Sequence, residues 1–265
     1  MARYLHSLVL SMVIELDAAL LVLMRVTGFV FLNDITGRKS IPSIVRFGIA
    51  LAISACFCSV YSGSLPQITG MMQFCVLAVK EVLVGFVLGF IINLFLSAII
   101  FGGEFIDFEI GLSIAKIYDT QTNVSMAISA SLINVLFFLV FFGMNGHLTL
   151  IALLDASFDV IGIGSITLEP QVCYNLCQMF SQMLLLGLKI AQPILAVMFI
   201  VEIGIAVIMR TIPQINIFTI NIQLKILLGI FLFLLMIPSL GSLMEHMIHM
   251  LFDNLYLAIS ALATS

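Results

Sequence analysis

The stretch FGGEFIDFEIGLSIAKIYDTQTN, residues 101–123, stands between two long apolar runs and carries three acids within six positions. These acids are Glu104, Asp107 and Glu109. If the stretch crossed a bilayer as a lipid-facing helix, the three charges would cost roughly 8–10 kcal/mol on insertion scales. A lipid-facing helix is therefore excluded here, and the fold has to be inferred from the apolar runs on either side.

The composition places the chain in a membrane. Of its 265 residues, 62% are hydrophobic and only 9% are charged, whereas soluble domains average about 25% charged residues. The mean hydropathy is +1.26. A soluble fold of this length could not cover so much apolar surface, so we expect an integral membrane protein. The net charge of −4 with no basic cluster argues against nucleic-acid binding.

The apolar runs predict helices and no barrel strands. They are long, and polar and apolar residues do not alternate along them, as they would in a membrane strand. The expected fold class is therefore an all-α membrane protein. The predicted segments are 8–32, 43–61, 73–101, 124–142, 147–163, 176–209, 218–240 and 243–263.

The predicted helices are of uneven length. Segment 73–101 would be roughly 43 Å long as one helix, which exceeds a hydrocarbon core of about 30 Å. Segment 176–209 is longer still and contains Pro193, which favours a kink or break because proline removes a backbone hydrogen bond. Simple bilayer spans do not explain this pattern.

Nine charged residues fall within or at the edges of the apolar segments. Each one alone is compatible with a helix end that snorkels to the interface, but nine facing lipid would be too costly. We therefore hypothesise that they pair, line water or face partner subunits. They are Glu15, Asp17, Arg25, Lys80, Glu81, Lys189, Glu202, Arg210 and Lys225.

The acidic stretch itself is expected to be partly irregular. Gly102-Gly103 and Gly111 are expected to interrupt a helix on either side of the acids. On one helix, Glu104 and Asp107 would share a face while Glu109 would lie about 140° from Glu104. A plain loop outside the membrane remains an alternative, although the apolar residues of GLSIAKIY (residues 111–118) are unusual for a solvated loop.

No pattern of catalytic or metal-binding residues is present. EHMIH (residues 245–249) lacks the His-Glu-x-x-His order of a zinc peptidase, and the five cysteines form no C-x-x-C pair. No P-loop or G-x-S-x-G nucleophile elbow occurs. GFVLG (residues 85–89) is a G-x-x-x-G pattern, which favours close helix packing. We expect a protein that is no enzyme and holds no metal and no cofactor.

Four short motifs, in order, resemble the FliR family, the R subunits of the flagellar type III protein export gate, which is related to the T component of virulence secretion systems. The first loop reads GRKSIPSIVRFG (residues 37–48), and GEFIDFEIGLSIAKIYD (residues 103–119) is similar to the family's Gly-Glu followed by Gly-Leu-Ser-x-Ala and Asp. NGHL (residues 145–148) and IPQINIF (residues 212–218) also fit. One departure is Thr120, where the family usually has proline. The resemblance covers about residues 25–251.

The resemblance implies a channel subunit built of helical hairpins. Residues 1–170 would resemble a P subunit, with a plug loop near 104–123, and residues 171–265 would form a Q-subunit-like hairpin and a C-terminal helix. The chain would join P-like and Q-like subunits in the bacterial inner membrane at the flagellar basal body. Unfolded flagellar proteins would pass through the pore that these subunits form.

The resemblance also implies which residues act. The plug that closes the pore would comprise Glu109, Ile110, Gly111, Leu112, Ser113, Ile114, Ala115, Lys116, Ile117 and Tyr118. Glu104 and Asp107 would form a polar shoulder at the preceding helix end. Subunit contacts would involve Lys189, Glu202, Arg210, Pro213, Gln214, Asn216 and Lys225, with Pro213, not Pro193, at the hairpin turn.

Two other functions remain open from the sequence. A virulence-type secretion gate would share most of these motifs. A secondary transporter with broken helices would show two related halves with an interrupted helix in each. Pro193 interrupts one half, but the other half has no clear counterpart.

Overall fold

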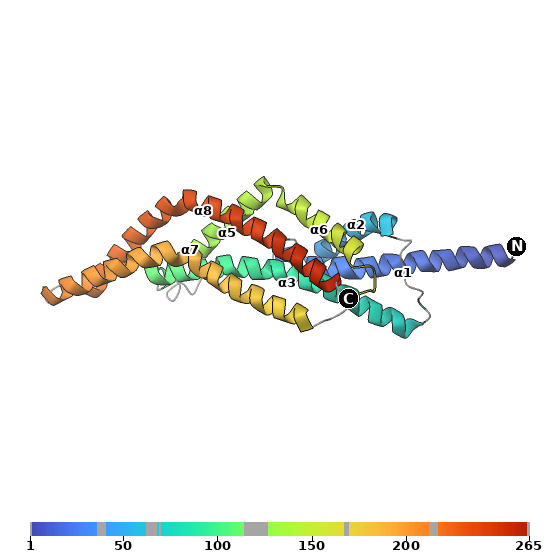
Figure 1. The fold of residues 1–265 in the computed structure, drawn as a ribbon. Helices are drawn as coiled ribbons and strands as arrows, with labels where there is room; N and C mark the ends of the chain where they lie inside the picture. The colour runs from blue at the N-terminus through green and yellow to red at the C-terminus, as the bar shows by residue number, and fades with distance from the viewer. Residues whose placement is uncertain are drawn as a thin grey trace. The chain divides into compact units, whose positions relative to one another are not determined.

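The computed structural model describes residues 2–35, 41–61, 68, 70–113, 127–166, 170–211 and 217–263. Throughout these residues the regular structure is helical and contains no strand, which confirms the predicted all-α class (Figure 1). The helices are α1 (Ala2–Leu32), α2 (Ser43–Tyr61), α3 (Met71–Ile110), α5 (Ile128–Gly143), α6 (Gly146–Val160), α7 (Pro170–Thr211) and α8 (Ile217–Ala263).

Among the residues that the structure describes, three helices are long and apolar enough to cross a membrane. They lie at Met71–Ile110, Pro170–Ile208 and Asn221–Ala263, and α5 with α6 would add a fourth span if the bent pair counts as one. The most apolar window of α3 is 67% buried within the chain, whereas those of α7 and α8 are only 22% and 17% buried. The apolar surfaces of α7 and α8 are thus left for contact with lipid or other proteins.

Two predicted interruptions are wrong. The α3 helix continues through Gly102-Gly103 to Ile110, so the three acids lie on a regular helix and not on an irregular connection. Segments 218–240 and 243–263 are one helix, α8, with Pro238 inside it, and α7 likewise continues through Pro193. In a helix held by tertiary packing, local propensity is a weak constraint. The expected kink at Pro193 stays a prediction.

The chain forms two compact units that interleave along the sequence. Unit 1 comprises Met1–Leu94, His147–Met179 and Met250–Ser265, and unit 2 comprises Phe95–Gly146 and Phe180–His249. The helices α3, α7 and α8 contribute to both units, and α6 begins with Gly146 in unit 2 and continues in unit 1. The predicted division at residue 170 into P-like and Q-like parts rests on resemblance to other subunits and not on compactness. The two compact units do not test it, and it stays a prediction.

In unit 1, α1 and α3 pack backbone against backbone through glycines. A Cβ atom added to Gly85 would lie 2.1 Å from the Arg25 carbonyl oxygen, and one added to Gly28 would lie 2.6 Å from the Val82 carbonyl oxygen. At Gly89 it would lie 3.0 Å from the Cβ of Leu32. The packing role predicted for the Gly85–Gly89 pattern is confirmed, because only glycine permits this approach.

In unit 2, glycines bring the second half of α3 close to its neighbours. A Cβ atom on Gly102 would meet the carbonyl oxygen of Gly187 on α7 at 2.7 Å, and one on Gly103 would meet the Cα of Ala130 on α5 at 2.2 Å. Gly102 and Gly103 are therefore contact points and not helix breakers. This close packing fixes where the last turns of α3 lie in unit 2.

Candidate functional site

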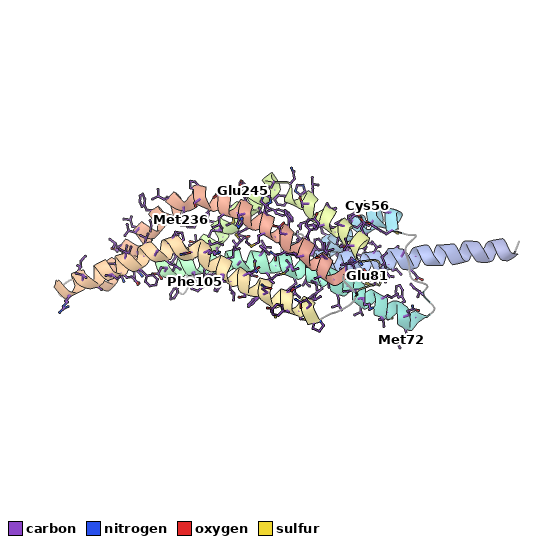
Figure 2. The ribbon with its side chains drawn as sticks, viewed as in Figure 1. Cys56, Met72, Glu81, Phe105, Met236 and Glu245 are labelled. Carbon is purple, nitrogen blue, oxygen red and sulfur yellow. The ribbon has the colours of Figure 1, made fainter. Side chains whose placement is uncertain are left out.

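The three acids at the end of α3 have different surroundings. Glu104 is exposed and borders an open hollow of about 420 Å³ with Phe105, Phe108 and Ser113; Figure 2 labels Phe105 on this part of α3. Asp107 is fully buried, although it was expected to share a face with Glu104. The proposed polar shoulder thus has one exposed and one enclosed carboxylate.

Asp107 caps the start of α5 from across the intervening segment. Its Oδ1 accepts a hydrogen bond from the backbone N–H of Ser129 at 3.1 Å. Position Ala127, where a helix usually carries its own capping side chain, provides no side-chain cap. The negative charge also lies near the positive end of the α5 dipole. Asp107 therefore ties together the two ends of the segment that joins α3 to α5.

Glu109 belongs to a small group of charges on three helices of unit 2. Its Oε1 lies 3.8 Å from the Nζ of Lys225 on α8, and both side chains are largely buried, with 11% and 13% of their surface exposed. Lys225 also forms an ion pair and hydrogen bond with Glu202 on α7, whose side chain is 43% exposed. Two of the predicted subunit contacts, Glu202 and Lys225, are thus paired with each other inside the chain.

Gly111 ends α3, as predicted. Its φ of +90° lies in the region that side-chain-bearing residues avoid. Its backbone N–H still donates to the Asp107 carbonyl oxygen at 3.1 Å. Just before it, Ile110 is buried and occupies the space above Gly229 on α8, where an added Cβ would lie 2.5 Å from Ile110 Cγ1.

An apolar cavity of about 540 Å³ opens beside the end of α3. Ile110 and Leu112 form part of its wall. The other lining residues come from α5 and α8 and include Leu132, Leu139, Phe233, Leu234 and Ile237. The first residues of the predicted plug therefore lie against a wholly helical, apolar wall of unit 2.

The remaining predicted site residues divide between exposed positions and positions outside the described part of the chain. Lys189 and Arg210 are exposed on α7. Ile114, Ala115, Lys116, Ile117 and Tyr118 of the predicted plug, and Pro213, Gln214 and Asn216 of the predicted hairpin turn, lie outside the described residues. The turn predicted at Pro213 falls between the end of α7 at Thr211 and the start of α8 at Ile217.

Unit 1 contains a buried ion pair whose partners the sequence did not identify. Arg25 on α1 and Glu81 on α3 are 0% and 1% exposed, and Arg25 Nε donates to Glu81 Oε2 at 2.6 Å. Figure 2 labels Glu81 on α3. The sequence predicted only that such charges pair with one another, line water or face partner subunits. The opposite signs in two apolar helices were the one available signal.

Tyr61, the last residue of α2, binds two carboxylates of α6 in the same unit. Its hydroxyl donates to Asp159 Oδ1 at 2.9 Å and lies 3.1 Å from Asp155 Oδ1. Burial, together with these two carboxylates, raises the pKa of the Tyr61 hydroxyl above its ordinary value. The phenol therefore remains a donor, and Asp155 and Asp159 on the apolar helix α6 share it as a partner.

The described residues contain no group of three or more His, Cys, Asp or Glu side chains that could hold a metal ion. The site is instead a set of helix ends, caps and ion pairs. Such an arrangement can fix a loop or join subunits.

Comparison with known proteins gives a consistent result. A family model described as "Bacterial export proteins, family 1" matches residues 16–251. The chain is 30% identical over 241 residues to the flagellar biosynthetic protein FliR of Escherichia coli, covering 91% of this chain and 92% of that one. It is 29% identical to FliR of Bacillus subtilis, covering 79% and 82%, and 28% identical to FliR of Aquifex aeolicus, covering 84% and 86%.

Proposed function

The chain belongs to the bacterial export proteins, family 1, and we propose that it is a channel subunit of the flagellar type III export gate that helps to form and close the pore for unfolded flagellar proteins. The match spans residues 16–251, so it includes all of unit 2, most of unit 1 and the end of α3. The curated relatives that it resembles over most of their length are named as flagellar biosynthetic proteins. These names favour a flagellar gate over a virulence gate, and the family favours export over secondary transport.

The single observation that carries the plug assignment is the hydrogen bond between Asp107 and Ser129. It joins the last turn of α3 to the first turn of α5. The two ends of the intervening segment, at Asp107 and Ser129, are therefore held together in unit 2. A loop with a fixed base can obstruct a pore at a defined position, while its tip stays free to be displaced by a substrate.

The base of the proposed plug is secured at three further points. Ile110 packs over Gly229, Glu109 faces Lys225, and Gly111 turns the chain out of the helix. Apolar packing and a largely buried charge pair act together here, so displacing the tip need not disturb the helices. Glu109 to Ser113 would then form the rigid part of the stopper, and residues 114–118 its apolar tip.

The proposed partners are P-like and Q-like subunits in the bacterial inner membrane at the flagellar basal body. The exposed apolar faces of α7 and α8 support this, because 22% and 17% burial leaves most of their apolar surface for other molecules. Lys189 and Arg210, exposed on α7, are candidate contact residues. We further propose that the subunit is no enzyme and acts by its shape.

The test is a deletion of residues 114–117 in cells that assemble the complete gate. The deletion leaves the anchors Asp107, Ile110 and Gly111 in place. We expect the complex to assemble and the membrane to become permeable to ions or small molecules. Permeability equal to that of the wild type, with the complex assembled, would refute the plug assignment; loss of assembly would instead make the loop a structural element.

A matched control separates the length of the segment from its composition. Replacing residues 114–117 by Gly and Ser residues of the same number keeps the length but removes the apolar side chains. If the apolar tip seals the pore, this variant should leak as the deletion does. If it remains tight, the bulk of the backbone alone would close the pore.

A further inference from the structure

The buried pair of Arg25 and Glu81 contacts more than its own two charges. Arg25 Nη1 donates to the Ser157 carbonyl oxygen at 2.8 Å, and Nη2 donates to the Ile161 carbonyl oxygen at 3.0 Å. The guanidinium carbon lies 4.2 Å from the centre of the Phe158 ring. All three of these groups belong to the end of α6 or the residue directly after it.

The last carbonyl groups of an α-helix have no partner within the helix. Arg25 supplies donors to this end of α6 from another helix, where a positive charge is also favoured by the helix dipole. Arginine suits this role because its planar group offers five N–H donors in fixed directions. Arg25 thus acts as a cap for α6 that comes from α1.

Glu81 binds the turn that follows α6. Its Oε1 accepts a hydrogen bond from the backbone N–H of Gly164 at 2.7 Å. Gly164 has a φ of +80°, and the turn is closed by a hydrogen bond from the Ser165 N–H to the Gly162 carbonyl oxygen at 3.0 Å. The carboxylate therefore holds the amide in the middle of a tight turn.

We propose that Arg25 and Glu81 are positioning residues that cap α6 and set the conformation of the turn Gly162–Ser165, and so fix the direction in which the chain leaves α6 in the export gate. The guanidinium and the carboxylate hold each other at 2.6 Å, and each then holds a different part of the backbone. An ordinary buried ion pair would serve only the packing of α1 against α3. Here the two charges also bind three backbone groups: the Ile161 carbonyl, the N–H of the half-buried Gly164, and the Ser157 carbonyl, which accepts the Ile161 N–H as well.

The decisive comparison replaces both charges by apolar side chains. A buried ion pair that acts alone is often replaced by well-packed apolar residues without loss. In the double variant Arg25→Met and Glu81→Leu, however, the Ile161 carbonyl group and the N–H of Gly164 would lose these partners, and the Ser157 carbonyl would keep only the Ile161 N–H. We expect amide hydrogen exchange over Ile161–Ile166 to rise roughly tenfold, as for loss of a charged hydrogen bond.

The measurement is hydrogen exchange on the full chain within its purified membrane complex. The milder variant Arg25→Lys keeps the charge but has three donors at one point, so exchange at Ile161–Ile166 should still rise, while exchange in the core of α3 stays unchanged. The exchanged pair, Arg25→Glu with Glu81→Arg, should not restore protection. A carboxylate would then face the carbonyl groups of Ser157 and Ile161, and a guanidinium would face the N–H of Gly164. Lys80→Met, one residue before Glu81, is the control and should match the wild type.

The proposal is overturned if the double apolar variant or the exchanged pair shows wild-type exchange at Ile161–Ile166, or if Arg25→Lys does so. If the double variant does not fold, Arg25→Lys decides. The role in the gate rests on the proposed function and is measured separately, as export by cells that carry these variants. If a variant shows fast amide exchange but exports at the wild-type level, the cap is supported and its role in the gate is refuted. If the wild-type chain itself does not support export, the proposed function is refuted and the cap is not.

Discussion

The Nζ of Lys225 on α8 lies 3.8 Å from the Oε1 of Glu109 on α3, and both side chains are largely buried. This pair joins the last turn of α3 to α8, directly before the chain leaves the helix at Gly111. A charge that loses its partner in such a place is costly because little water can solvate it.

Charge substitutions can show whether Glu202 pairs with Lys225 inside the chain or with a basic residue of another subunit. Because Glu202 pairs with Lys225 within the chain, Glu202→Lys should weaken this region modestly, by up to about 1 kcal/mol for a pair that is partly exposed. Because Lys225 also faces Glu109, the matched variant exchanges all three charges: Glu202→Lys, Lys225→Glu and Glu109→Lys should recover complex yield on native gels. Failure of this triple variant to recover would indicate that Glu202 serves a basic residue of a partner subunit.

Asp107 is expected to stabilise the base of the proposed plug. Asp107→Ala removes the cap on Ser129 N–H, and loss of an N-cap costs about 0.5–2 kcal/mol. Amide exchange at the start of α5 should rise, and the assembled gate should leak. Glu104→Ala is the control, because Glu104 is exposed on the same helix; equal effects of the two variants would contradict the cap.

Gly111 is expected to tolerate few substitutions although nothing surrounds it. No atom lies within 4 Å of an added Cβ, so the constraint is its φ of +90° and not space. Gly111→Val should cost roughly 1–2 kcal/mol and misdirect the segment that follows, which ion leak in the assembled gate would report. Gly111→Asn, a residue that accepts positive φ more readily, should be close to wild type; equal leak in both variants would point to crowding outside this chain.

Gly85 should not accept even one methyl group. Its Cβ would lie 2.1 Å from the Arg25 carbonyl oxygen, so Gly85→Ala must separate α1 from α3, at a cost of about 1–3 kcal/mol. Gly48 on α2 has nothing within 4 Å, and Gly48→Ala should stabilise by about 0.5–1 kcal/mol. Thermal unfolding of the two variants in the same detergent tests the difference, and a neutral Gly85→Ala would rule out the close crossing.

Tyr61 gives a prediction for alkaline pH. The fold raises the pKa of its hydroxyl above the ordinary value of 10.0, so the folded state holds this proton more tightly than the unfolded state. The resulting stability is present below pH 10 and is lost as the pH rises above that value. The difference in stability between the wild type and Tyr61→Phe should therefore shrink above pH 10, and a constant difference in denaturation curves would contradict the assignment.

The sequence was sufficient for the class of fold because composition and run length determine it. An all-α membrane protein follows from apolar runs that no soluble domain could cover, and Gly111 was identified as a helix end from its type. The packing of Gly85–Gly89 was also predicted from spacing alone. These features depend on local sequence, which can be read without knowing the neighbours.

The errors arose where distant residues override local preference. Gly102 and Gly103 were interpreted as breaks, but α7 and α5 approach so closely there that only glycine fits, and the helix continues. The hydrogen bond between Asp107 and Ser129 joins residues separated by 22 positions, and that between Arg25 and Glu81 joins residues separated by 56. Nothing in the spacing of these residues specifies their partners.

Arg25 and Gly28 lie three positions apart on α1, and both meet α3, one through its charge and the other through a bare backbone. One added residue between them would turn the two halves of the helix by about 100° relative to each other, so only one contact could survive. The spacing of the two residues therefore sets the rotation of α1 about its own axis relative to α3. Insertions and deletions in related chains should be rare within this interval, whatever happens to the length of the helix before it.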